Sequence, residues 1–136
     1  MSRNPALVQP ALGVLLRALR EEHKLSLRDL AQRAGMDHAY IHRLETGAKV
    51  SPSCEAIDKI VRSLKIRRRE AELLRYLAVH RDVDPVLVRY ALKDASVSIA
   101  EFATAAGATH GRAGKHDYKI LITRIRRFLA EINQMG

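Results

Sequence analysis

Apolar residues recur every three or four positions along most of the chain, which is the spacing of residues on one face of an α-helix. The first such set comprises Leu12, Leu15, Leu16 and Leu19. No segment alternates apolar and polar residues with turn signals at the spacing of a β-hairpin. The pattern therefore predicts an all-α fold.

Two short helices are predicted within "LSLRDLAQRAGMDHAYIHRLETG". Ser26 is a typical N-cap residue, and Asp29 stands three residues later, where a capping box places an acidic partner. Gly35 can adopt the left-handed conformation that ends a helix. Asp37 can then cap a second helix, which we expect over about residues 37–45.

The remaining apolar stripes divide the rest of the chain. A fourth helix follows a serine cap at Ser51 or Ser53, and Pro85 begins a sixth helix after the cap residue Asp84. The segment "GATHGRAGKHD" has three glycines and no large apolar residue, which predicts a flexible loop. The predicted organisation is a domain at 11–66, a helical extension at 67–106, the loop at 107–117 and a C-terminal amphipathic helix at 118–134.

Residues 27–46 have the side chains of a helix-turn-helix. Ala31 is small where the two helices must cross closely, and Gly35 lies in the turn between them. Ile41 and Leu44 face inward and anchor the second helix from beneath. This arrangement holds one helix away from the body, where it can enter the major groove of DNA, which is about 12 Å wide.

The stretch "LLRALREEHKLSLRDLAQRAGMDHAYIHRLETG" resembles the DNA-binding domain of the lambda-repressor/Cro-like (XRE) regulators. The similarity covers about residues 11–66 and rests on "LSxxxLAxxAG" followed by "YIxxLExG", which together form a specific signature. The resemblance implies a lambda-repressor-like helix-turn-helix domain, followed here by a small helical C-terminal domain or extension. It also implies a transcriptional regulator that binds operator DNA, usually as a dimer and most often as a repressor.

The resemblance also implies roles for individual residues. The base-reading positions of the recognition helix are His38, Ala39, His42 and Arg43. From the resemblance or from their chemistry, the residues expected at the DNA backbone are Arg17, Ser26, Arg28, Arg33, Tyr40, Thr46 and Lys49. Arg20 and Glu45 match a structural ion pair that ties the first helix to the third. Leu27 is a departure, because the family often has a phosphate-contacting glutamine at this position.

The charge of the chain favours a polyanionic partner. There are 24 Lys and Arg residues against 15 Asp and Glu, which gives a formal net charge of +9. Both halves contribute, with 11 basic and 7 acidic residues up to Lys65 and 13 and 8 after it. Such an excess attracts a polyanion over about 10 Å at moderate salt. Arg43 in particular can offer two parallel hydrogen bonds to guanine O6 and N7.

A metal site is the alternative interpretation of His38 and His42. The two residues are four apart, so they share a helix face, and such pairs can bind zinc. A zinc-protease motif needs Glu directly after the first histidine, and Ala39 stands there. No third ligand is adjacent. We therefore expect the pair to face DNA, with no metal and no other cofactor.

No class of enzyme is indicated. The sequence has no P-loop, no dinucleotide-binding fingerprint and no serine nucleophile elbow. Cys54, the single cysteine, is expected at the start of the fourth helix as a small, partly buried residue. The N-terminus lacks the apolar stretch of a signal peptide, and no apolar run approaches the roughly 20 residues of a membrane span. We therefore expect a cytoplasmic protein without membrane contact.

Three interpretations of the C-terminal half stay open. The apolar stripe of the last helix can belong to the core of a small domain or to a homodimer through the C-terminal helices. Core packing combined with self-association is the reading we favour. The last helix can alternatively form a second DNA surface, because this half is as basic as the first. The candidates for that surface are Arg112, Lys115, Lys119, Arg124, Arg126 and Arg127.

We therefore predict a sequence-specific regulator of transcription that binds double-stranded DNA, most simply a repressor of phage or mobile-element type. The alternative is an antitoxin, which binds a toxin protein and regulates its own promoter. RNA is not favoured, because aromatic residues make up only 4% of the chain and offer no stacking platform. No site for a small-molecule ligand is evident.

Overall fold

A computed structural model describes residues 10–48, 51–110 and 116–135. All regular secondary structure in these ranges is helical, which confirms the predicted all-α fold. The helices are α1 (Ala11–Glu22), α2 (Leu27–Ala34), α3 (His38–Thr46), α4 (Cys54–Leu64), α5 (Arg68–Val79), α6 (Pro85–Lys93), α7 (Ile99–Ala108) and α8 (Tyr118–Met135). Within the described ranges, none of them combines the length and the apolar character that crossing a membrane requires.

Side-chain caps fix where α2, α3 and α4 begin. Ser26 accepts a hydrogen bond from the Asp29 backbone N–H and Asp29 accepts one from the Ser26 N–H, both at 3.0 Å, so the predicted capping box is present. These hydrogen bonds lower the pKa of Asp29. Asp37 caps α3, and Ser53 rather than Ser51 caps α4. Every one of these bonds joins residues at most three apart, which is why the sequence indicates them.

The helix α7 continues further than its sequence predicts. It extends to Ala108, two residues into the segment 107–117 that is predicted to be a loop. The Thr109 hydroxyl donates to the Ala105 carbonyl at 3.0 Å and satisfies one of the last acceptors of the helix. The predicted loop is therefore wrong at its first residues, and its central part, 111–115, lies outside the described residues.

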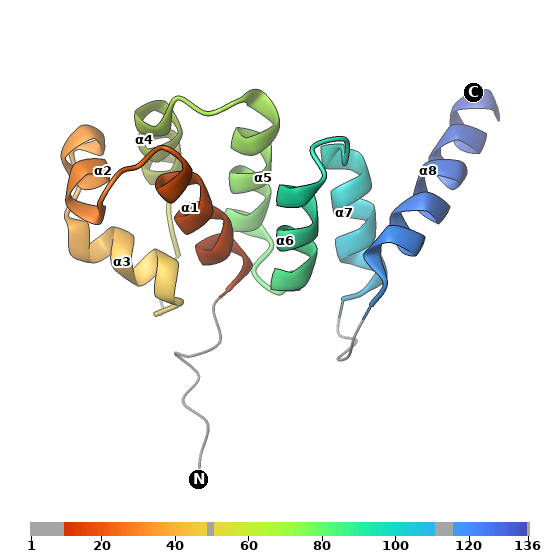
Figure 1. The fold of residues 1–136 in the computed structure, drawn as a ribbon, viewed down its shortest axis with the longest axis horizontal. Coiled ribbons are helices and arrows are strands. Elements are labelled where there is room, and N and C mark those ends of the chain that lie inside the picture. The colour runs from red at the N-terminus through yellow and green to blue at the C-terminus, as the bar shows by residue number, and fades with distance from the viewer. Residues whose placement is uncertain (1–9, 49–50, 111–115, 136) are drawn as a thin grey trace, which may run out of the picture.

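One continuous core joins the two halves of the chain. The helix α1 lies between α2 and α3 on one side and α5 and α6 on the other, and it packs against α3, α5 and α6 (Figure 1). Fully buried side chains of this core include Leu15, Ile41, Leu74, Leu87 and Phe102, from five different helices. The helical extension is therefore packed onto the helix-turn-helix region rather than separated from it.

Arg69 of α5 holds the connection between α6 and α7. Its guanidinium donates to the backbone carbonyls of Val97 at 2.6 Å, Ala91 at 2.8 Å and Asp94 at 3.1 Å. Burial lowers the pKa of Arg69. Because α6 ends next to Asp94, its last carbonyls lack partners within the helix and favour a cation there.

The helix α8 is attached to the body through its first half. The Tyr118 hydroxyl donates to the Asp84 carboxylate at 2.5 Å, and Arg126 forms an ion pair with Glu101 at 3.1 Å. Burial, together with this hydrogen bond, raises the pKa of Tyr118. The second half of α8 extends from the end of the molecule opposite α2 and α3 (Figure 1).

The apolar stripe of α8 is present, but the body covers only its first part. Ile122 and Ile125 are buried, whereas Phe128, Ile132 and Met135 are 55%, 45% and 86% exposed. Helical periodicity identifies the apolar face of a helix but does not say what covers that face. The second half of α8 therefore has an unpartnered apolar surface within the described part of the chain.

Candidate nucleic-acid interface

A tight turn at Gly35 joins α2 to α3. This glycine has φ +66° and ψ +39°, a left-handed conformation that most residues with a Cβ adopt only at a cost. The next residue, Met36, donates its backbone N–H to the Ala31 carbonyl at 2.9 Å, which closes the end of α2. Ala31 itself is buried. The turn therefore has the geometry that the sequence predicts for residues 27–46.

The helix α3 has one buried face and one exposed face. Ile41, Leu44 and Glu45 are buried and fix its rotation about its own axis. The opposite arc carries the predicted base-reading positions, because residues 38, 39, 42 and 43 share one face of a 3.6-residue helix. His38, His42 and Arg43 are exposed and Ala39 is partly exposed. The structure therefore brings all four positions together on one accessible surface.

A largely buried ion pair connects α3 to α1, with the Arg20 and Glu45 side chains 12% and 5% exposed. Arg20 donates from Nε to Glu45 Oε2 at 2.6 Å and from Nη2 to Glu45 Oε1 at 3.0 Å. Its Nη1 donates to the Leu25 carbonyl at 2.8 Å. The hydrogen bonds with Glu45 raise the pKa of Arg20. The ion pair implied by the family resemblance is therefore present, and it joins the last turns of α1 and α3 to the connection between α1 and α2.

Gly13 allows α1 and α3 to approach closely. A Cβ added at this position would lie 2.3 Å from the Glu45 carbonyl oxygen and 2.9 Å from that of Leu44. Both atoms belong to the backbone, so no change of rotamer can move them away. Sequence reasoning missed this residue; the available signal was an isolated glycine inside a helix of otherwise apolar inward positions. Gly13 and the Arg20–Glu45 pair together position the C-terminal end of α3.

Several candidates for backbone contact lie at the two ends of α2. Ser26 and Arg28 are at its start and Arg33 is at its end, and all three are exposed. The backbone N–H groups at a helix start also favour anions such as phosphate. Tyr40 lies at the edge of α3 and is half-buried, and this burial raises the pKa of its hydroxyl.

The other three candidates for backbone contact differ from one another. Arg17 is exposed and forms an ion pair with Glu21 at 3.2 Å, so this carboxylate competes with phosphate for its charge. Thr46, the last residue of α3, is partly exposed. Lys49 lies outside the described residues.

The proposed second DNA surface is only partly described. Arg112 and Lys115 lie outside the described residues. Lys119, Arg124 and Arg127 are exposed on α8. Arg126 is held in place by Glu101 and by the Ser96 hydroxyl, to which its Nη2 donates at 2.8 Å. Since α8 lies at the opposite end of the molecule from α3, the structure does not join these residues to the α3 surface (Figure 1).

Two further sequence expectations concern metal and thiol chemistry. The described residues contain no group of three or more His, Cys, Asp or Glu side chains placed to hold a metal ion. His38 Nδ1 instead lies 3.8 Å from Asp37 Oδ1. Cys54 begins α4 as predicted, but it is exposed rather than partly buried, because it precedes the first inward position of that helix at Ile57.

Two short helices joined at a left-handed glycine, with the second helix exposed along one face, define a helix-turn-helix domain. Comparison with known proteins agrees, since residues 11–74 match the family model described as "Helix-turn-helix domain". The chain therefore contains a helix-turn-helix domain in its N-terminal half.

A curated relative places this domain in a more specific context. The HTH-type transcriptional repressor RghR of Bacillus subtilis (strain 168) is 43% identical over 56 residues, which are 41% of this chain and 42% of that protein. The chain thus spans about two fifths of the length of this relative. No solved structure matches the chain significantly.

Proposed function

We propose that the chain is a transcriptional repressor of the lambda-repressor/Cro-like type that binds specific sites in double-stranded DNA. In this proposal α3 enters the major groove, and His38, His42 and Arg43 contact base edges. Ser26 and Arg28, at the start of α2, contact phosphates and fix the register of the domain on the duplex. The protein acts in the cytoplasm, where it meets its operator.

The observation that carries this proposal is the division of α3 into two faces. Ile41, Leu44 and Glu45 lock one face to the body, so the polar side chains of the other face are presented in a fixed orientation. Arginine in such a position reads guanine by two hydrogen bonds. The net charge of +9 adds the sequence-independent attraction that DNA-binding proteins need. The similarity to a relative named as a transcriptional repressor supports repression over the antitoxin alternative.

Replacing Arg43 with alanine tests base reading directly. Operators are first selected from a pool of random duplexes. Arg43→Ala is expected to weaken binding to the selected operator by about 1–3 kcal/mol, because one bidentate base contact is lost. Its binding to random duplex is expected to change much less. Both affinities are measured by fluorescence anisotropy at a fixed salt concentration.

Arg28→Ala is the matched control, since it removes the same charge from a residue assigned to the backbone. This variant should weaken operator and random duplex alike and lower the slope of log K against log salt by about 1. Equal losses on both kinds of duplex for Arg43→Ala would contradict base reading by α3.

We also propose that the C-terminal helices join two copies of the chain. Phe128, Ile132 and Met135 continue the apolar stripe at intervals of four and three residues, the spacing of a helix–helix seam. Arg127 and Glu131 flank this stripe with opposite charges. In an antiparallel pair of α8 helices, two-fold symmetry makes each contact occur twice, so one register would place both Arg127 side chains near the Glu131 of the other copy.

Acidic substitutions in this stripe test the proposed contact. The variant Phe128→Asp/Ile132→Asp is expected to elute as a monomer of 15.3 kDa by light scattering, whereas the unaltered chain elutes at twice that mass. Val79 and Val86 are exposed on other helices, so Val79→Asp/Val86→Asp is the control and should leave the dimer intact. A monomeric unaltered chain would refute dimerisation through α8.

A further inference from the structure

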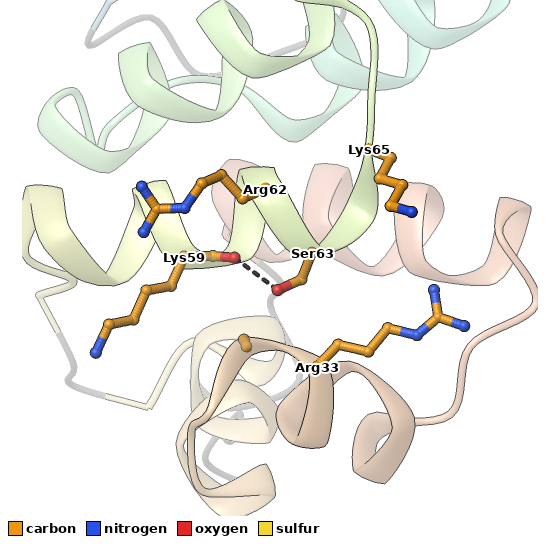
Figure 2. A pocket seen from close by; sticks show the side chains of 6 residues that line it. Arg33, Lys59, Arg62, Ser63 and Lys65 are labelled. Atoms are coloured by element: carbon orange, nitrogen blue, oxygen red, sulfur yellow. Dashed lines mark hydrogen bonds between the residues drawn. The ribbon is translucent and has the colours of Figure 1, made fainter.

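An open cleft between α2 and α4 is surrounded by cations. It has a volume of about 670 Å³ and is lined by Arg33, Ala34, Lys59, Arg62, Ser63 and Lys65. Figure 2 shows Arg33 and Lys65 on one side with their charged ends turned towards each other, and Lys59 and Arg62 extending along the other side. No acidic side chain is among the described residues that line the cleft.

Most of this charge is not neutralised within the described part of the protein. Lys59 forms an ion pair with Glu55 at 3.6 Å, and their side chains are 41% and 80% exposed. Arg62 and Lys65 form no ion pair with any described residue, and Arg33 interacts only at longer range with Asp29, one turn earlier on α2. Like charges gathered in one place repel one another, so an unliganded cleft of this kind weakens the folded state. If an anion is bound, the same cations stabilise the folded state by attracting it.

The backbone at Lys65 determines where one of these cations lies. Lys65 follows α4 with φ +53° and ψ +46°, a left-handed conformation in which helices usually have glycine. A residue with a Cβ is strained in this conformation. This conformation sets the position of the Lys65 side chain at the cleft, and Lys24, which does not line the cleft, has a similar one with φ +55°.

From this geometry we infer that the cleft binds a ligand with two or more phosphate groups. Cations on both sides suit a chain of phosphates better than a single anion, and arginine and lysine are the usual partners of phosphate oxygens. The volume lies within the range of small-ligand sites, which is about 300–1,000 Å³. Because every lining residue except Ala34 has a charged or polar side chain, charge rather than apolar burial holds the ligand. The same chemistry is offered by a free oligophosphate, such as a nucleoside triphosphate, and by the backbone of a duplex.

The experiment measures binding of two probes, sodium tripolyphosphate and a duplex, to the full chain. The test variant is Arg62→Gln/Lys65→Gln, which leaves Arg33 and the α3 surface unchanged. Lys24→Gln/Arg68→Gln is the control, since it removes the same charge from exposed positions that do not line the cleft. We expect the test variant to lose at least about tenfold in tripolyphosphate affinity relative to the control, because two charge-assisted contacts are lost. Chemical shift changes on adding tripolyphosphate should centre on residues 59–65.

The outcomes separate the two sources of phosphate. If the duplex alone responds to Arg62→Gln/Lys65→Gln, with a salt slope lower than that of the control, the cleft holds the DNA backbone. Equal losses in the test and control variants, or no response to either probe, would overturn the inference. Tripolyphosphate binding in the cleft of a chain that selects no operator would refute the proposed function and leave this inference standing.

Discussion

Glu45→Ala is expected to lower the free energy of unfolding by about 3–5 kcal/mol, the usual cost of removing one partner of a buried ion pair. The loss is large because the Arg20 guanidinium keeps one hydrogen bond, to the Leu25 carbonyl, and only the longer-range attraction of Glu21. A domain of this size has roughly 5–15 kcal/mol of stability in total, so the variant should unfold at a much lower urea concentration. Circular dichroism at 222 nm during urea titration measures the change.

Two controls distinguish the buried pair from ordinary surface charge. Glu21→Ala breaks the exposed Arg17–Glu21 pair on the same helix and should cost about 0.3–0.5 kcal/mol. Arg20→Met/Glu45→Met removes both charges together and should recover most of the stability lost in Glu45→Ala. A Glu45→Ala loss no greater than that of Glu21→Ala would show that the pair does not hold α3 to α1.

Gly13→Ala is expected to destabilise the protein by about 2–3 kcal/mol, towards the upper part of the range for overpacking. Through helix propensity, alanine would stabilise α1 by about 1 kcal/mol relative to glycine. However, the Cβ of alanine at this position would lie 2.3 Å from the Glu45 carbonyl oxygen. The contact can be relieved only by moving α1 and α3 apart. Operator affinity should therefore fall even under conditions where the variant is fully folded. Urea denaturation and DNA-binding anisotropy provide the two readouts.

Gly107 provides the matched control for this substitution. It also lies within a helix, but a Cβ added there would meet no atom within 4 Å. Gly107→Ala should therefore stabilise the chain by about 0.5–1 kcal/mol through helix propensity alone. If Gly13→Ala were stabilising too, the close approach of α1 and α3 would not constrain the position of α3.

The parts of this structure that could be predicted from sequence are those determined by local interactions. Ser26, Asp37 and Asp84 bond backbone N–H groups two or three residues away, so they mark helix starts wherever the rest of the chain lies. The exposed face of α3 also follows from local periodicity, since Ile41 and Leu44 define the opposite face. The Arg20–Glu45 pair joins residues 25 apart and was accessible only through the family resemblance.

The remaining features depend on contacts between distant residues, which periodicity does not specify. Gly13 meets Glu45 only because two helices cross at that point. The Tyr118–Asp84 bond joins residues 34 apart. The cleft between α2 and α4 combines Arg33, which the sequence assigned only to the DNA backbone, with three cations near residue 62 that the sequence assigned to no ligand. The exposed end of α8 was unpredictable for a related reason, because its stripe resembles that of a covered helix.

The proposed recognition helix α3 and the free end of α8 lie at opposite ends of the same core (Figure 1). Two chains joined through α8 would therefore present their reading helices at the outer extremes of the assembly, with both bodies between them. Such a pair suits an operator whose two recognition sequences are separated by a long spacer, or two distant sites brought together by looping of the DNA. The length of the spacer would then correspond to the distance between the two α3 helices of the dimer.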